Sequence, residues 1–169
     1  LDKENLSHEI KDADIIYHLA GITSVGTTVD DKDPKRDKII REVGITGTRN
    51  IVKLSKPDVK IVFPSTHVVF EGLKIQKKNI NEKYEPIPVL EYAKGKVQSE
   101  RDLIKSRKNY IILRLGSVFG NSFDSTRVNI MPNLFSKITS SDGTIKLFGN
   151  GAQLKSLVSV KDVVRSMKF

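Results

Sequence analysis

The stretch DADIIYHLAG (residues 12–21) indicates the fold class, because its apolar run is typical of a buried parallel strand. That run, DIIYHLA (14–20), has two counterparts, KIVFPS (60–65) and YIILRLG (110–116). All three are rich in β-branched residues and alternate only weakly between apolar and polar, which is typical of parallel strands covered on both faces. The sequence therefore predicts three buried parallel strands.

The segments around these strands show the spacing of apolar residues that is typical of helices. Apolar residues recur every three to four positions from Ile39 to Leu54, and a second helix is expected at about 91–107. A short helix with Leu6 and Ile10 facing inward should precede the first strand. The alternation of helices and strands predicts right-handed crossovers and a parallel sheet with helices on both faces.

The character of the chain changes after Gly120. NIMPNLFSKI (129–138) favours a helix, TIKLFG (144–149) and LKSLVSV (154–160) favour short strands, and KDVVRSMKF (161–169) favours a last helix. Upstream, the irregular stretch at about 71–90 is long enough to suggest a functional loop.

Composition excludes several classes of protein. No apolar run approaches the roughly 20 residues that a membrane span needs, and no signal peptide is visible. Cysteine is absent, which rules out disulfides and thiolate metal sites and favours the cytoplasm. The net charge of +9 comes from short lysine clusters without interleaved aromatic residues, a pattern that favours solvated surfaces over a nucleic-acid site. A phosphate-bearing small substrate would also suit this charge.

The glycine fingerprint of a dinucleotide fold, G-x-G-x-x-G between a strand and a helix, does not occur in the sequence. GITGTRN (44–50) has related spacing but falls inside a predicted helix. GNGAQL (149–154) lacks the third glycine and lies late in the chain. Neither segment is expected to bind pyrophosphate.

Eight blocks nevertheless resemble, in order, the motifs of extended short-chain dehydrogenase/reductases of the NAD-dependent nucleotide-sugar epimerase/dehydratase family. The blocks are DADIIYHLAGITSVG (12–26), GITGTRNIV (44–52), IVFPSTHVVFEG (61–72), EYAKGKVQSE (91–100), LRLGSVFGN (113–121), NIMPNLF (129–135), IKLFGNG (145–151) and LVSVKDVV (157–164). A single Tyr-x-x-x-Lys match is weak, but eight blocks in family order cover nearly the whole chain.

This resemblance implies an α/β fold, a partial Rossmann-like doubly wound parallel sheet with the start of a small substrate-binding region. Residues 1–120 would be the C-terminal part of an NAD(P)-binding Rossmann domain, and residues 121–169 the beginning of the nucleotide-sugar-binding region. In the family, three strands and the glycine-rich turn precede the block at 12–26. We therefore expect an N-terminally truncated fragment that binds NAD(P) negligibly, shows no turnover and self-associates along the unpaired edge of 14–20.

Tyr92 and Lys96 are one helical turn apart and should share a face. A free phenol has a pKa of about 10, and a nearby ammonium lowers that value by favouring the phenolate. By resemblance, Tyr92 would transfer the proton of a sugar hydroxyl while hydride passes to or from the nicotinamide. Lys96 would also bond the nicotinamide ribose, and Thr66 would polarise the same substrate oxygen. The alternative for all three is an ordinary surface pair and a strand-end threonine.

Further site residues follow from the resemblance alone. The expected cofactor contacts beyond Tyr92 and Lys96 are Leu19, Ala20, Gly21, Thr23 and Ser65. The expected substrate contacts are His67, Ser117, Asn129, Phe148 and Lys155. Phe148 could equally be a core residue. No metal site is expected, and His18 should pack or hydrogen-bond beneath its strand.

Several positions depart from the family pattern. Thr23 replaces a lysine, Gly44 and Ser117 replace asparagines, and Lys155 replaces a diphosphate-binding arginine. Val68 stands where the dehydratases carry an acidic residue, which argues against dehydration. The block STHVVFEG (65–72) also resembles dTDP-4-dehydrorhamnose reductases.

The sequence thus favours an NAD(P)-dependent nucleotide-sugar epimerase that transfers hydride transiently at a sugar carbon. The alternatives are a nucleotide-sugar reductase and a dinucleotide-binding remnant without turnover. We expect the cofactor to be NAD or NADP, the partner to be a nucleotide-sugar substrate, and the full-length protein to be a cytoplasmic homodimer. Neither nucleic acid nor a membrane is expected as a partner.

Overall fold

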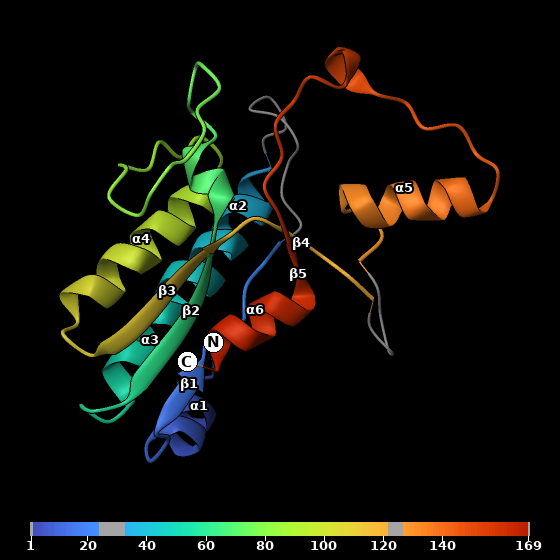
Figure 1. Ribbon diagram of the computed structural model, residues 1–169. Helices are drawn as coiled ribbons and strands as arrows, with labels where there is room; N and C mark the ends of the chain where they lie inside the picture. The colour runs from blue at the N-terminus through green and yellow to red at the C-terminus, as the bar shows by residue number, and fades with distance from the viewer. Residues whose placement is uncertain (1, 24–32, 122–126, 169) are drawn as a thin grey trace. The chain divides into compact units, whose positions relative to one another are not determined.

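The structure is a computed structural model that describes residues 2–23, 33–121 and 127–168 (Figure 1). It divides into two compact units, Leu1–Arg114 and Leu115–Phe169. The second unit begins a few residues before Gly120, where the sequence suggested a change of character. The assignment of cofactor and substrate roles to the two parts remains a prediction.

Three strands form the sheet of the first unit, in the order β1 (Ile15–Tyr17), β2 (Lys60–Thr66), β3 (Asn109–Leu115). β1 and β2 are parallel, with Ile16 opposite Ile61. β3 runs beside β2 in the same direction (Figure 1). The prediction of adjacent parallel strands is therefore confirmed for all three segments.

β1 is shorter than the run at 14–20 that predicted it. The amide of His18 still donates to the carbonyl of Val62 at 3.0 Å, but the amide of Leu19 turns back to the carbonyl of Tyr17. This three-residue turn takes the backbone out of the ladder. Apolar character continues past that point, so sequence periodicity could not locate the end of the strand.

The helices of the first unit match the predicted segments closely. They are α1 (Lys3–Ile10), α2 (Pro34–Arg41), the π-helix η1 (Glu42–Thr46), α3 (Gly47–Leu54) and α4 (Glu91–Lys105). The stripe from Ile39 to Leu54 is a continuous helical run whose middle turn is widened into a π-helix. As predicted, the glycines of GITGTRN lie inside this run and form no phosphate-binding turn.

The core of the first unit lies on one face of the sheet. Its buried members are Ile51, Val59, Ile61, Phe63 and Leu103, and Leu6 and Ile10 pack against them, as predicted. Ile16 faces the same core, so the alternation of a strand turns Ile15 and Tyr17 to the opposite face. Those two side chains are 47% and 46% exposed. Helical cover of that second face remains a prediction.

The long loop between β2 and α4 is tied at both ends. A 3-10 turn, η2 (His67–Phe70), begins it, and the remainder up to α4 is irregular, as expected. The amide of Gly72 donates to the carbonyl of Ile87 at 2.9 Å, and the amide of Ile87 donates to Val69 at 2.8 Å. At Gly72 a side chain would be only 2.6 Å from the carbonyl oxygen of Ile87, which requires glycine there. The two ends of the loop are therefore fixed against each other.

The second unit contains a smaller parallel pair, β4 (Ser117–Phe119) and β5 (Leu157–Ser159). Two helices, α5 (Met131–Ser140) and α6 (Val160–Met167), were both predicted within two residues of their starts. A 3-10 turn, η3 (Phe148–Gly151), lies between them. β4 was not predicted, because three residues are too few to give a periodic signal.

The strand predicted at TIKLFG (144–149) is wrong. Residues 144–147 are irregular and η3 follows. Gly149, Asn150 and Gly151 have φ values of 55°, 53° and 71°, which lie in the left-handed region and cannot continue a strand. The pairing partner of β4 is instead LVS at 157–159.

Candidate active site

A hollow that is partly open to solvent lies within the first unit. Its wall includes Ala20 and Gly21, which follow β1, and Gly44 of the π-helix. Tyr92, Lys96 and Ser99 of α4 complete that part of the lining. The hollow thus joins the end of a parallel strand to one face of a helix, which is where open α/β sheets bind ligands.

The side chain of Lys96 is the main charged group of this hollow. Its ammonium donates to the carbonyl of Pro64 at 2.8 Å and lies 4.4 Å from the centroid of the Phe63 ring. Burial lowers the pKa of Lys96 to about 8, while the negative charge of Glu100 acts in the opposite direction. A cation held here has little water around it and acts strongly on neighbouring groups.

Tyr92 lies one turn before Lys96 and lines the same hollow, as the spacing predicted. The Lys96 ammonium is 5.9 Å from the centroid of the Tyr92 ring. Thr66 is buried at the end of β2, where its hydroxyl accepts the amide of Val68 at 3.3 Å and caps η2. The structure therefore brings Tyr92 and Lys96 together, whereas Thr66 is not among the residues that line this hollow.

Below Lys96, a buried ion pair connects α4 to two strands. Glu100 is 3% exposed and is bonded by the guanidinium of Arg114, with a shortest contact of 2.7 Å. The hydroxyl of Ser65 donates to the same carboxylate. Ser65 was expected to contact the cofactor, but its hydroxyl is already engaged here. Sequence reasoning missed Glu100, although its spacing of four residues from Lys96 places both on one helix face.

A second buried polar cluster joins four elements of the first unit. The ring nitrogen Nε2 of His18 lies 2.9 Å from the hydroxyl of Thr48. That hydroxyl donates to the carbonyl of Gly44 at 2.7 Å and lies 3.2 Å from the hydroxyl of Ser99. His18 is only 4% exposed. The expectation that it packs and bonds beneath its strand is therefore confirmed.

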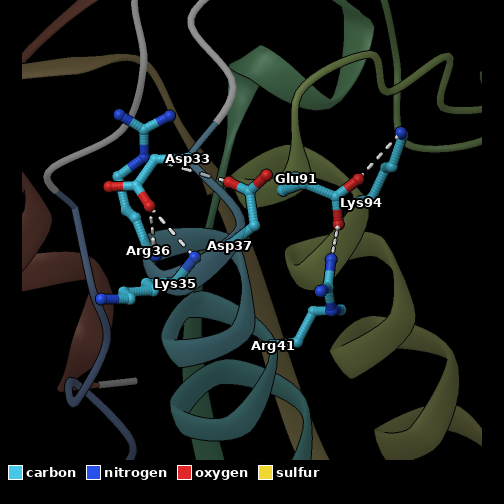
Figure 2. A network of polar contacts seen from close by, with 7 residues as sticks. All are labelled: Asp33, Lys35, Arg36, Asp37, Arg41, Glu91 and Lys94. Carbon is cyan, nitrogen blue, oxygen red and sulfur yellow. Dashed lines mark hydrogen bonds and ion pairs between the residues drawn. The ribbon is translucent and has the colours of Figure 1, made fainter.

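The first turn of α4 is held from outside the helix, as Figure 2 shows. Glu91, the residue before Tyr92, accepts from Arg41 of α2 at 2.7 Å and from Lys94 at 3.0 Å. The hydrogen bond from Lys94, with Arg41 also contributing, lowers the pKa of Glu91. On the other side, Glu71 accepts the amides of the two residues before α4, at 2.9 and 2.6 Å. These contacts fix the turn that carries Tyr92.

The residues expected at a cofactor are divided between exposed and lining positions. Ala20 and Gly21 line the hollow, whereas Leu19 is 61% exposed and Thr23 is exposed. A side-chain carbon added at Gly21 would meet no atom within 4 Å. The backbone at Gly21 is therefore open to approach by a ligand.

Comparisons with known proteins identify the family of the chain. The NAD dependent epimerase/dehydratase family matches residues 1–169. The chain belongs to this family. A UDP-glucose 4-epimerase from Mycolicibacterium smegmatis is 27% identical over 164 residues, which cover 89% of this chain and 48% of that protein. The chain thus spans about half the length of the curated relative that it matches.

Solved structures of the family share the fold. A UDP-glucuronic acid 4-epimerase from Bacillus cereus, in complex with NAD, is 23% identical with a TM-score of 0.77, covering 98% of this chain and 51% of the other. A dTDP-glucose 4,6-dehydratase from Streptomyces venezuelae, with NAD and TYD bound, is 21% identical with a TM-score of 0.76, covering 97% and 50%. An epimerase and a dehydratase are equally similar, so the fold does not select between these reactions.

The family's expected substrate positions lie mostly in the second unit. Ser117 is half-buried in β4, whereas Asn129 and Lys155 are exposed. Phe148 begins η3, but its side chain lies outside the described residues. In the first unit, His67 is half-buried at the start of η2. The role of each as a substrate contact stays a prediction.

Within the described residues, two kinds of feature are absent. No helix there is both long and apolar enough to cross a bilayer. No group of three or more His, Cys, Asp or Glu side chains there is arranged to hold a metal ion.

Proposed function

We propose that the chain is part of an NAD(P)-dependent nucleotide-sugar epimerase in which Tyr92 and Lys96 act on a sugar hydroxyl. The observation that carries this proposal is the shared hollow, which both Tyr92 and the partly buried Lys96 line. Family membership supports the cofactor and the substrate class. As in the sequence-based prediction, the epimerase reaction is the simplest one for this site.

The hollow suits the nicotinamide ribose end of the cofactor. The backbone of Ala20 and Gly21 and the ammonium of Lys96 would hold it, because sugar hydroxyls accept hydrogen bonds from an ammonium. The open space at Gly21 lets a ligand approach the main chain. When bound, the nicotinamide would supply the hydride acceptor and donor. Leu19, Thr23 and Ser65 are proposed as further contacts.

The proton chemistry belongs to the side chains of the chain itself. Tyr92 would take the proton of the sugar hydroxyl on its phenolate oxygen and return it later. The positive charge of Lys96 favours that phenolate, and the burial of Lys96 strengthens the effect. Thr66 would donate its hydroxyl to the same sugar oxygen. The bond from the amide of Val68 uses only a lone pair of this oxygen, so the hydroxyl proton stays available to donate.

We propose that the nucleotide sugar contacts His67 and residues of the second unit, namely Ser117, Asn129, Phe148 and Lys155. The related epimerases act on UDP-glucose and UDP-glucuronic acid by name, so UDP-sugars are the first substrates to test. Lys155 would attract the diphosphate as a point charge, without the two-pronged geometry of arginine. A homodimer remains the proposed assembly.

The test is a Tyr92→Phe substitution in the complete product of the gene that encodes this sequence. Turnover of a UDP-sugar should fall about 10²- to 10⁴-fold, the range for a general acid–base group, while NAD binding measured by calorimetry persists. Tyr110→Phe is the matched control, because Tyr110 is exposed at the start of β3 and should leave turnover unchanged. Unchanged turnover in Tyr92→Phe would remove Tyr92 from the mechanism.

The reductase alternative rests on the block STHVVFEG (65–72), in which His67 and Val68 follow Thr66. A reductase consumes one reduced cofactor for each product, whereas an epimerase returns the cofactor to its original state. Net oxidation of NADPH with a 4-dehydro sugar nucleotide, and no interconversion of UDP-sugars, would favour the reductase.

A further inference from the structure

We propose that His18 is a positioning residue, an imidazole that is neutral at neutral pH and holds α4 through Thr48 and Ser99 so that Tyr92 and Lys96 face the hollow. Its consequence for turnover rests on the proposed function, but its protonation state and its effect on Lys96 do not. His18 follows β1, Thr48 belongs to α3 and Ser99 to α4. The Gly44 carbonyl adds η1, so one cluster connects four elements.

The hydrogen bonds of Thr48 assign the tautomer of His18. A hydroxyl has one proton, and the carbonyl of Gly44 can only accept, so at 2.7 Å Thr48 donates to Gly44. The oxygen of Thr48 must then accept from His18, which places the imidazole proton on Nε2 at 2.9 Å. Ser99 completes the pattern by donating to the same Gly44 carbonyl at 3.2 Å. The lone pair of His18 is consequently on Nδ1.

The surroundings of His18 oppose a second proton. Nδ1 is buried and has no hydrogen-bond partner among the described residues. Burial, reinforced by the charge of Lys96, lowers the pKa of His18 to about 4. Apart from His18, the titratable residues that line the hollow are Tyr92 and Lys96. The ring also lies 5.3 Å from that of Phe63, centroid to centroid. A charged His18 would place a second cation beside Lys96.

The cluster is placed to set the orientation of α4. Ser99 follows Lys96 by three residues and Tyr92 by seven, so all three lie on one face of the helix. The cluster is anchored at the Gly44 carbonyl of the π-helix. This carbonyl accepts from the hydroxyls of Thr48 and Ser99 as well as from the amide of Gly47. Rotation of α4 about its axis would break the contacts of Ser99 and move Lys96 from the carbonyl of Pro64.

The first test measures the chain itself by nitrogen-15 NMR of the His18 ring. We expect the Nε2-protonated tautomer at neutral pH and a His18 pKa of about 4. A proton on Nδ1, or a pKa of His18 near the ordinary value of about 6.5, would overturn the proposal. This measurement requires neither cofactor nor turnover, so it remains decisive even where a variant fails to fold.

The second test follows Lys96 by carbon-13 NMR of its Cε atom in three variants. Ser99→Ala removes the contact between α4 and the cluster and should raise the pKa of Lys96 from about 8 toward its usual 10.5, because the ammonium gains water. Ser106→Ala is the matched control, since its hydroxyl bonds Leu103 at the far end of α4. His18→Gln keeps a neutral donor and should preserve the Lys96 pKa. Equal shifts in Ser99→Ala and Ser106→Ala would contradict the proposal.

In the complete gene product, Ser99→Ala should lower kcat about 10- to 100-fold and leave KM nearly unchanged, because misplaced catalytic groups slow the chemical step. His18→Gln should retain most of the activity. A wild-type protein without turnover would contradict the proposed function, whereas the NMR results would still decide the role of His18. Full activity in Ser99→Ala would show that the cluster does not position α4.

Discussion

The two units of the chain differ in how their side chains are held. Among the described residues, every buried apolar side chain except Val163 belongs to Leu1–Arg114. All the buried polar residues, including His18 and Glu100, belong to the same unit. In the second unit, Leu154 and Leu157 are 51% and 43% exposed. The first unit therefore has a packed core and the second has little core in its described part.

Their hydrogen bonds differ in the same way. The start of α4 is fixed by Glu71 and Arg41, whose contacts span 18 to 50 residues of the sequence. The start of α6 is capped locally, by Ser159 and Asp162 of its own first turn. Long-range contacts can hold a catalytic side chain in one orientation, whereas local caps only define where a helix begins. The proposed proton-transfer groups lie in the unit with long-range contacts.

The largest expected effect comes from the core of the first unit. Leu103→Ala removes a fully buried side chain and should lower the free energy of unfolding by about 2–5 kcal/mol. Leu154→Ala is the same substitution at an exposed position of the second unit. It should change the free energy of unfolding by roughly 0.5 kcal/mol or less. Urea denaturation of both variants measures the difference. Equal costs would show that the second unit has a core comparable to the first.

The partly buried ammonium of Lys96 should make the free energy of unfolding depend on pH in the alkaline range. Its pKa is about 8 in the folded chain and 10.5 in the unfolded chain, so between these values the unfolded chain binds the extra proton. Stability should therefore rise with pH across this window, by at most about 3 kcal/mol at 1.36 kcal/mol per pKa unit. Lys96→Met should remove that rise. If the free energy of unfolding of Lys96→Met still rises with pH in this window, the rise comes from other groups and the prediction for Lys96 is wrong.

Loss of Glu71 should have a moderate effect. Glu71→Ala leaves the amides of Val89 and Leu90 without their carboxylate acceptor and should cost about 1–2 kcal/mol. The turn before Tyr92 should loosen, so hydrogen exchange of those two amides should accelerate. Glu85→Ala, an exposed position in the same loop, is the control. Unchanged protection at Val89 and Leu90 would contradict the assigned contact.

The surface ion pairs should contribute least. In a double-mutant cycle, Arg41 and Glu91 should couple by roughly 0.2–1 kcal/mol, and salt should weaken the coupling. The pair Arg165 and Asp162 of the second unit is more exposed and its members are three residues apart. Its coupling should be smaller still. A stronger coupling in the second pair would reverse the expected order of the two units.

Local patterns in the sequence determined the strand segments, most helix positions and the shared face of Tyr92 and Lys96. These features follow from periodicity and spacing, because neighbours along a helix or strand are neighbours in space. The eight family blocks also indicated the family, which the match over residues 1–169 confirmed. Gly149 and Gly151 already signalled a turn in TIKLFGNG, but the apolar run before them favoured a strand.

Only the tertiary structure determined the groups around the hollow. Glu100 meets Arg114 and Ser65, and His18 meets Thr48, across separations of 14 to 35 residues. The π-helix, whose Gly44 carbonyl accepts from Thr48 and Ser99, has no signature in residue spacing. Sequence spacing describes one element at a time, whereas burial and the lowered pKa values of His18 and Lys96 depend on which elements pack together. That is why the sequence indicated Tyr92 and Lys96 as a pair, and only the packing of four elements revealed what holds them.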